Sequence, residues 1–294
     1  MPKVLRRFLM LSPAMLMIGL FMLIPILIIV AYSFMDANPY GGVRAKFSTE
    51  AYVQLVFERD FDDTLLFNKS NLLIFGRSIS LALASTLLSL LIAFPVAYYM
   101  SRQEGQRKHI LVLLVTIPFW TNLLIRTFCW ILILRDTGLI NNFLLAIKVI
   151  DSPLPLLNNN GAVLLGLIYS YIPFMILPIY ATLEKLDTRL LEAAHDLYAN
   201  RWQVLRLISI PLALPGIIAG CILVFIPSLG AFVTPQLLGG GKNLMLGSLI
   251  QLQFSSSRNW PFGAALAVLL LALVMLALIF YARGPARRSE GGLL

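Results

Sequence analysis

Residues 207–241 read LISIPLALPGIIAGCILVFIPSLGAFVTPQLLGGG and contain no charged side chain. A helix of about 20 residues crosses the hydrocarbon core of a bilayer, so this run of 35 residues is long enough to span a membrane. Five more stretches have the same property, one of them interrupted by Arg126 alone: 8–35, 78–101, 109–134, 152–183 and 259–282. We therefore predict an all-α, polytopic membrane protein with six transmembrane helices.

The composition supports this class. The chain has 294 residues, of which 59% are hydrophobic and 13% are charged, whereas soluble domains are about 25% charged. A soluble enzyme and a disordered chain are therefore both disfavoured. The net charge of +9 is better explained by basic cytoplasmic loops near anionic lipid than by nucleic-acid binding. Cys129 and Cys221 fall within apolar stretches, which favours two buried free thiols over a disulfide.

A single transmembrane domain, residues 1–294, is predicted. The first span is treated as a retained anchor, because its apolar core is about twice the 7–15 residues of a signal peptide. The outer loop 36–74 contains an amphipathic stretch, 48–57, in which Ser48 or Thr49 can cap a short interfacial helix. The six spans are expected at 12–34, 75–100, 110–134, 162–183, 207–232 and 261–282.

The positions of Lys and Arg predict the orientation. Alternate loops carry 13 basic residues on the side of both termini and nine on the other side. Five of those nine lie in the long first loop, and short loops follow the positive-inside rule best. Both termini are therefore expected in the cytoplasm.

The sequence contains no motif for ATP hydrolysis and no metal-binding signature. The nearest approach to a phosphate-binding loop, Gly239-Gly240-Gly241-Lys242-Asn243, has Asn where Ser or Thr must reach magnesium. The two histidines, His109 and His195, lie in separate loops and form no metal signature. We therefore expect no cofactor in this chain. The energy for its activity should come from an ion gradient or from a partner chain.

The loop between the fourth and fifth spans is the most informative segment. Asp187 can cap a helix over 187–200, and apolar residues recur there at helical spacing. These residues are Leu190, Leu191, Ala194 and Leu197. Helix physics leaves two interpretations open: an amphipathic helix on the membrane surface, or a short helix that inserts into a soluble partner.

The residues that follow carry a resemblance. Glu192-Ala193-Ala194, followed by Ile208-x-Ile210-Pro211, resembles the EAA loop of bacterial ABC-importer permeases. Other stretches resemble the inner-membrane permeases of spermidine/putrescine importers, and the similarity covers nearly the whole chain after residue 75. They are Pro118 to Arg126, Leu183 to Asp187, Gly216 to Gly220, Leu237 to Gly240, and Asn259 to Gly263. Importers of opines, amino-acid derivatives or ferric iron share the loop and remain alternatives.

This resemblance implies a type I ABC-importer permease in the bacterial inner membrane. Such a chain forms half of a pathway with a homologous second permease. Two ATPase subunits that bind ATP and Mg would dock below, and a periplasmic binding protein would deliver a polyamine or related solute above. The residues expected to couple to the ATPase are Glu192, Ala193, Ala194, Asp196, Tyr198 and Arg201.

Two positions depart from the family pattern. Tyr198 stands where the motif has glycine, and a left-handed backbone there costs a non-glycine residue about 1–2 kcal/mol. Asn200, which tolerates that conformation better, could take over the turn. Ala231 stands where some relatives carry an acid, so a polycation would have to rely on other groups.

A desolvated cation can be held by aromatic faces, at about 2 kcal/mol or more per contact. The substrate-pathway candidates are Trp120, Asn122, Asp136, Tyr169 and Tyr171; packing or lipid contact is the alternative for the aromatic residues. Arg126, the one intramembrane charge, is expected to be structural, with bonds to carbonyls between spans.

A secondary transporter would need intramembrane acids and an inverted repeat, and a membrane enzyme would need clustered catalytic groups. The sequence shows no intramembrane acids, no inverted repeat and no clustered catalytic groups.

Overall fold

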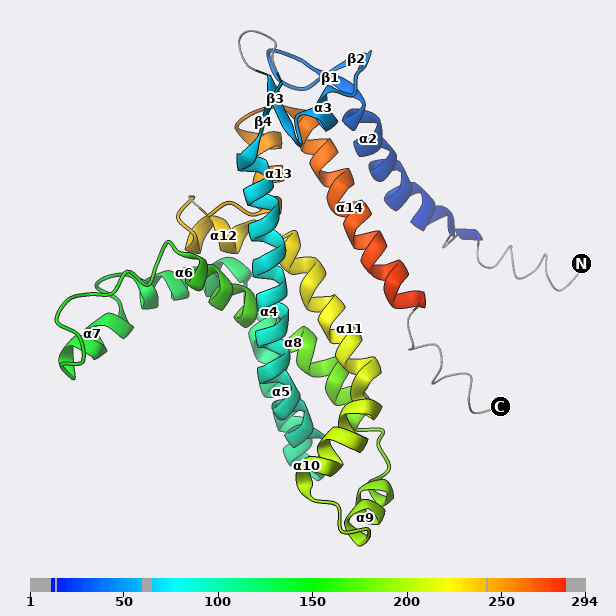
Figure 1. Cartoon of the computed structure of the whole chain (residues 1–294), viewed down its shortest axis with the longest axis vertical. Helices are drawn as coiled ribbons and strands as arrows, with labels where there is room; N and C mark the ends of the chain where they lie inside the picture. The colour runs from blue at the N-terminus through cyan, green and yellow to red at the C-terminus, as the bar shows by residue number, and fades with distance from the viewer. Residues whose placement is uncertain (1–11, 14, 60–64, 242, 284–294) are drawn as a thin grey trace, which may run out of the picture. The chain divides into compact units, whose positions relative to one another are not determined.

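The computed structural model describes residues 12, 13, 15–59, 65–241 and 243–283, and most of this part is helical (Figure 1). The chain divides into two compact units. Unit 1 comprises residues 1–73 and 249–273, and unit 2 comprises 74–248 and 274–294.

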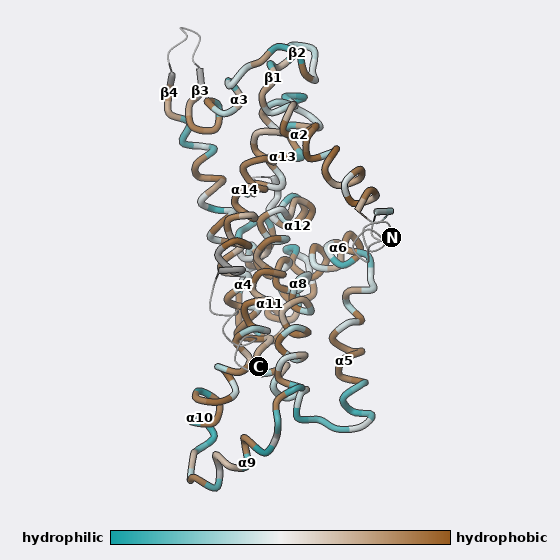
Figure 2. Tube along the Cα trace, turned by 90° about the vertical axis from the view of Figure 1, so that its right-hand side faces the viewer, coloured by the Kyte–Doolittle hydropathy of each residue, from teal (hydrophilic) through white to brown (hydrophobic). Residues whose placement is uncertain are grey.

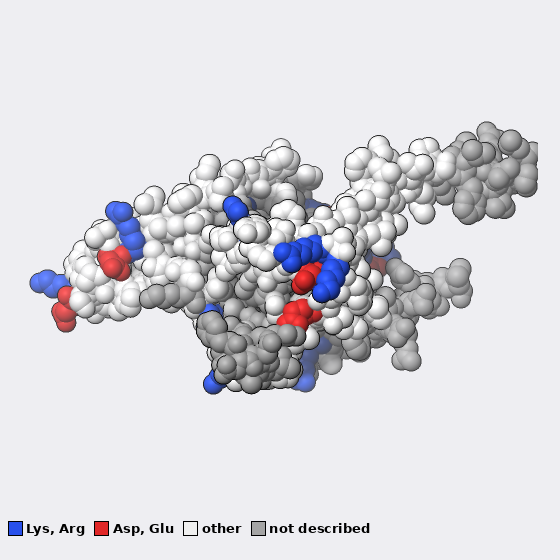
Figure 3. Space-filling view, turned by 90° about the horizontal axis from the view of Figure 1, so that it is seen from above, with Lys and Arg blue, Asp and Glu red and all other residues white. Residues whose placement is uncertain are grey.

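Within the described residues, five helices are long and apolar enough to cross a membrane, and a bent pair of helices would make a sixth span. The five are Met15–Ser33, Lys69–Ser101 (α4), Asn160–Leu183 (α8), Arg201–Leu229 and Trp260–Ile279. Figure 2 shows hydrophobic colour along α4 and α8, and Figure 3 shows Lys, Arg, Asp and Glu side chains gathered in separate patches on an otherwise uncharged face. The prediction of an all-α membrane fold is confirmed.

The predicted third span, 110–134, is not one continuous helix. It consists of α5 (Gly105–Trp120) and α6 (Leu123–Leu134), and the chain bends by 89° between α5 and the segment Leu123–Ala146 that α6 begins. Thr121 has an extended backbone, and the Asn122 side chain accepts a hydrogen bond from the Leu124 amide at 2.8 Å. Asn122 therefore begins a new helix as its N-cap, which the apolar pattern alone did not reveal.

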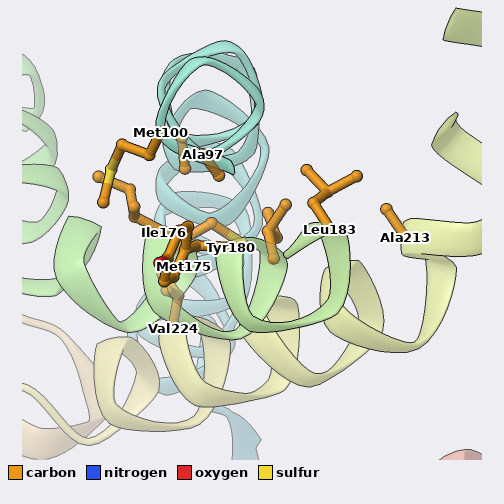
Figure 4. Close-up of a cluster of buried hydrophobic side chains, with 10 residues drawn as sticks. Ala97, Met100, Met175, Ile176, Tyr180, Leu183, Ala213 and Val224 are labelled. Atoms are coloured by element: carbon orange, nitrogen blue, oxygen red, sulfur yellow. The ribbon is translucent and has the colours of Figure 1, made fainter. Parts of the chain in front are cut away.

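The centre of unit 2 is the contact between α8 and α11 (Ile210–Leu229). Gly216 and Gly220 allow the two helices to approach closely, as small residues do in membrane bundles. A Cβ on Gly216 would lie 2.1 Å from Thr182 Oγ1, and one on Gly220 would lie 2.8 Å from Met175 Sδ. In Figure 4, the labelled side chains of α8 lie between those of α4 and α11.

Shorter elements complete unit 2. They are α7 (Leu139–Ala146), α9 (Thr188–Asp196), α10 (Arg201–Val204), the π-helix η2 (Leu205–Ser209) and α12 (Val233–Leu238). Two buried hydroxyl contacts connect distant segments: Ser85 Oγ lies 3.2 Å from Ser228 Oγ, and Ser78 Oγ accepts from the Leu246 amide at 2.8 Å. Cys129 and Cys221 are free, as predicted, but neither is fully buried: Cys129 is exposed and Cys221 is half-buried.

Unit 1 contains short strands that the sequence did not predict. The antiparallel pairs are β1 (Met35–Ala37) with β2 (Val43–Phe47), and β3 (Phe57–Arg59) with β4 (Leu65–Phe67). The helical elements are η1 (Gly19–Leu23), α2 (Ile24–Ser33) and α3 (Glu50–Val53). The helices α13 (Leu246–Ser255) and α14 (Trp260–Arg283) belong in part to this unit.

The amphipathic stretch 48–57 forms only the four residues of α3. Thr49 holds the N-cap position without a side-chain hydrogen bond, and Ser48 Oγ accepts from the Glu50 amide at 3.2 Å. The stretch is anchored by Tyr52, whose hydroxyl lies 2.8 Å from Ser33 Oγ. It is thus a packed part of the loop rather than an independent interfacial helix.

Candidate functional site

The first candidate site is the loop that carries α9, which follows α8 and precedes α10 (Figure 1). The helix begins as predicted, because Asp187 Oδ1 accepts from the Arg189 amide at 3.0 Å. Ala194 is buried, and Leu191 is half-buried. The α9 helix therefore packs through small and aliphatic residues, and its carboxylate side chains are exposed.

The remaining predicted coupling residues lie on the accessible surface of this loop. Glu192, Ala193 and Asp196 are exposed, as are the apolar side chains of Leu190 and Leu197. Carboxylates beside exposed apolar groups and a small residue suit insertion into a complementary protein surface.

The turn after α9 adopts the left-handed conformation at Tyr198, where φ is 60°. The Ala199 amide donates to the Ala194 carbonyl at 3.0 Å, which is the bond of a Schellman helix ending. Asn200 does not take over this turn, so that alternative is wrong. Its φ is −75°, and it forms a capping box with Gln203 at the start of α10.

The chain then continues without interruption into the membrane helix. Residues 201–229 pass through α10, η2 and α11 as one helical run. Arg201, another predicted coupling residue, is exposed and lines a pocket of about 500 Å³ with Arg102 and Trp202. The Arg102 guanidinium lies 4.4 Å from the centre of the Tyr98 ring. Arg201 thus lies across a pocket from the end of α4.

An ion pair beside this loop was not foreseen. Lys108 near the start of α5 pairs with Glu184 at the end of α8. The hydrogen bond from Lys108 is the main cause that holds the pKa of the Glu184 carboxyl below its usual value. Glu184 lies in the stretch 183–187 that carries the family resemblance, but its partner is distant in sequence and left no local signal.

The second candidate site is the break between α5 and α6. Trp120 ends α5 and is 84% exposed, and Asn122 caps α6. Tyr171 of α8 is half-buried, and its hydroxyl donates to the Pro227 carbonyl of α11 at 3.4 Å. Trp120 and Tyr171 thus occur in contrasting settings, one open and one held between helices.

The other pathway candidates are Tyr169 and Asp136. The Tyr169 ring packs edge-on against Trp130, with the ring centres 5.5 Å apart. Asp136 is exposed in the turn between α6 and α7. Their assignment to the pathway stays a prediction.

Arg126 lies in α6. We expected this guanidinium to be bonded to carbonyls. Its Nε and Nη1 atoms are instead buried without a hydrogen-bond partner among the described residues. The carbonyl bonds expected for these two atoms are not formed.

Unit 1 holds a polar pocket of about 410 Å³ that sequence reasoning missed. Its walls are connected through Gln54, whose carbonyl accepts from Asn71 Nδ2 at 3.0 Å and whose Oε1 accepts from Asn259 Nδ2 at 3.3 Å. Glu50 contributes a carboxylate to the lining. Asn259 opens the resemblance stretch 259–263, which was the one available signal. Among the described residues, no group of three or more His, Cys, Asp or Glu could hold a metal ion.

Comparison with known proteins identifies the class. The chain belongs to the family of binding-protein-dependent transport system inner membrane components, which matches residues 93–288. It is a multi-pass inner-membrane protein and a permease subunit of an ABC importer.

Several individual permease proteins are similar to this chain in sequence. The chain is 39% identical over 264 residues to the spermidine/putrescine transport system permease protein PotB of Escherichia coli, covering 90% of this chain and 92% of the relative. It is 40% identical over 263 residues to PotB of Haemophilus influenzae, covering 90% and 88%. The inner membrane ABC transporter permease protein YdcU of Escherichia coli is 35% identical over 230 residues, covering 74% and 73%.

A solved structure agrees in fold. A chain of a bacterial alginate ABC transporter, crystallised with an alginate pentasaccharide-bound periplasmic protein, superposes with a TM-score of 0.76. The match covers 98% of both chains at 17% identity. This likeness confirms the predicted type I permease fold.

Proposed function

We propose that this chain is one half of the transmembrane pathway of an ATP-driven polyamine importer. The similarity to PotB over 90% of the chain supports spermidine or putrescine as the solute. A homologous second permease would complete the pathway, and a periplasmic binding protein would deliver the solute. Two ATPase subunits would bind ATP and Mg, and both termini of this chain would lie in the cytoplasm.

The observation that carries the coupling role is the path from α9 to the membrane helices. Exposed Glu192 and Ala193 would contact the ATPase, while buried Ala194 holds α9 to its own unit. The turn at Tyr198 leads directly into the continuous helical run 201–229, which packs closely on α8 through Gly216 and Gly220. A displacement of α9 on closure of the ATPase dimer would therefore move α11 and α8 together, as in rigid-body alternating access.

Substrate contacts are proposed at Trp120 and Tyr171. The predicted spans contain no acid, so they offer a polyamine aromatic faces and carbonyl groups, and cation–π contacts strengthen when water is excluded. Ala231 is buried and supplies no carboxylate. That substitution favours a second candidate, an importer of the same class for a less cationic solute such as an opine.

Charge reversal at Glu192 tests the coupling role. Truncating one side of a docked charge pair costs about 2–5 kcal/mol, and Glu192→Lys should cost at least as much because it adds repulsion. Since Glu192 is exposed on α9 and lies outside the spans, we expect normal membrane levels, weaker copurification of the ATPase and no uptake. Normal ATP-driven uptake by this variant would contradict the role of α9.

Competition experiments test the solute. Vesicles that contain the complete importer should take up radiolabelled spermidine, and unlabelled putrescine should compete with it. Competition by an opine or an amino-acid derivative, without competition by putrescine, would favour the second candidate.

A further inference from the structure

A pocket of about 360 Å³ lies between α9 and the ends of the helices that face it. We call it the α9 pocket. Its walls come from the end of α4, the start of α5, the end of α8, α9 itself and η2. Figure 2 shows both hydrophobic and hydrophilic colour on α9, and hydrophilic colour on the loop that leads into α5. All of these segments belong to unit 2.

The charges that line the α9 pocket are mainly negative. Glu104, Glu184 and Glu192 contribute carboxylates, and Arg102 contributes one guanidinium. Lys108 pairs with Glu184, whereas Glu104 and Glu192 have no hydrogen bond or ion pair with any described residue. The Arg102 side chain is held by Tyr98, which both accepts its hydrogen bond and presents its ring. The Glu104 carboxylate is therefore available to a cation, and the Glu192 carboxylate is available whenever it is not in contact with the ATPase.

A buried hydroxyl in the wall is an independent sign of a ligand. Ser209 is 1% exposed, and its Oγ has no hydrogen-bond partner among the described residues. Ser209 ends the π-helical turn η2, in which the Leu205 carbonyl accepts from the amide of Ile210. A buried polar group without a partner is unfavourable, and π-helical turns often mark functional sites. An ammonium group would give Ser209 Oγ a donor.

The rest of the lining favours an extended organic cation over a metal ion. Leu183, Leu186 and Leu191 add apolar surface that suits methylene groups. A metal ion would instead need several closely spaced ligands, and the described residues contain no such cluster.

We propose that the α9 pocket binds an alkyl polyamine from the cytoplasmic side and that its occupancy inhibits import. The cytoplasmic location and the identity of the inhibitor as imported product rest on the proposed function. Ammonium groups would bind Glu104, Glu192 and Ser209, which belong to different elements. A bound polyamine would tie α9 to the start of α5 and to η2, so α9 could no longer follow the ATPase. Accumulated product would thereby slow its own uptake.

Direct binding tests the site. The permease–ATPase complex without the binding protein is placed in nanodiscs, and the Kd of spermidine is measured by calorimetry. Loss of a charge-assisted hydrogen bond should weaken binding about tenfold or more in Glu104→Gln, and several-fold in Ser209→Ala. Glu104 makes no helix-capping bond, and Ser209 Oγ has no partner to lose, so both variants should fold. Asp151→Asn, in the loop before α8, is the matched control and should bind normally.

Inhibition is tested in vesicles that carry the complete importer. Spermidine loaded inside should slow uptake by the wild type and by Asp151→Asn, but not by Glu104→Gln. Uptake into unloaded vesicles should be equal in all three. Wild-type affinity for spermidine in both Glu104→Gln and Ser209→Ala, or undetectable binding to the wild type, would overturn the site. If the wild type binds spermidine through Glu104 and Ser209 but does not import it, the proposed solute is wrong and the site stands.

Discussion

Two membrane segments of this permease respond differently to proline. The α8 helix contains Pro173 and Pro178 and stays continuous over Asn160–Leu183. The segment of α5 and α6 contains a single proline, Pro118, yet the chain breaks shortly after it and bends by 89° between α5 and the segment Leu123–Ala146. Half of the most apolar window of α8 is buried, whereas α5 has no buried residue.

The difference shows that packing, rather than the number of prolines, determines whether these helices break. Neighbouring helices can satisfy the backbone groups that a proline frees, and α8 has α11 against it. At the end of α5, a competing local structure forms instead, because Thr121 is extended and Asn122 caps the next helix. The polar cap at Asn122, in a span with little packing around it, therefore disrupts the helix more than the two prolines of the well-packed α8 do.

The largest expected effect follows from separating α8 and α11. Gly216→Val would place its Cβ 2.1 Å from Thr182 Oγ1 and 2.5 Å from the Pro178 carbonyl oxygen. Overpacking typically costs about 1–3 kcal/mol, and contact with backbone raises that cost. We expect a lower thermal midpoint in detergent and reduced membrane levels. Leu223→Val, an exposed residue of the same helix, is the control; equal stability of both variants would contradict the packing argument.

The aromatic candidates should distinguish the two segments at the level of transport. If each contacts the cation, Tyr171→Leu and Trp120→Leu should each slow uptake by about 5- to 30-fold, the equivalent of ~1–2 kcal/mol. Only Tyr171→Leu should also lower stability, since it loses the bond to the Pro227 carbonyl. Unchanged uptake kinetics in both variants would reassign the two residues to packing or lipid contact.

The helix break between α5 and α6 can be tested by removing the cap at Asn122. Asn122→Ala removes the cap at Leu124 and should cost about 1 kcal/mol of stability. The conservative variant Asn122→Asp keeps an acceptor and should retain the break. Distances between spin labels at positions 113 and 132 would report the bend. Identical distance distributions in wild type and Asn122→Ala would show that the cap does not maintain it.

The smallest effect is expected at the end of α9. Tyr198→Gly removes the strain of a left-handed tyrosine, about 1–2 kcal/mol, but glycine gains conformational freedom in the unfolded chain. The net stabilisation should be below about 1 kcal/mol, measured as a shift in the thermal midpoint. A clear destabilisation would mean that the tyrosine ring makes a contact in the assembled importer.

The sequence predicted those features whose signals are local. Charge-free runs gave the spans, Asp187 gave the start of α9, and the motif around Glu192 gave the family. The break at Thr121 has a local signal as well, an Asn after a proline within an apolar run, but the hydrophobic pattern continues across it. The two hairpins of unit 1 are too short for an alternating pattern to stand out.

Features that depend on distant partners could not be predicted. The Lys108–Glu184 pair, the Gln54–Asn259 contact and the isolation of Ser209 Oγ each depend on how separate helices are placed. Arg126 illustrates the limit: its charge was visible in the sequence, but the lack of partners for two of its nitrogens was not.

The interrupted span also has an electrical consequence. Because α5 ends at Trp120, its last carbonyl groups lack amide partners within the helix; one of them, that of Pro118, accepts from the Thr121 hydroxyl at 2.8 Å. The aligned peptide dipoles place the equivalent of about half a negative charge at such a helix end. The N-terminus of α6 begins beside it, after the cap at Asn122, and carries the equivalent of about half a positive charge. The break therefore places fixed partial charges of opposite sign side by side within the span, and neither of them titrates with pH.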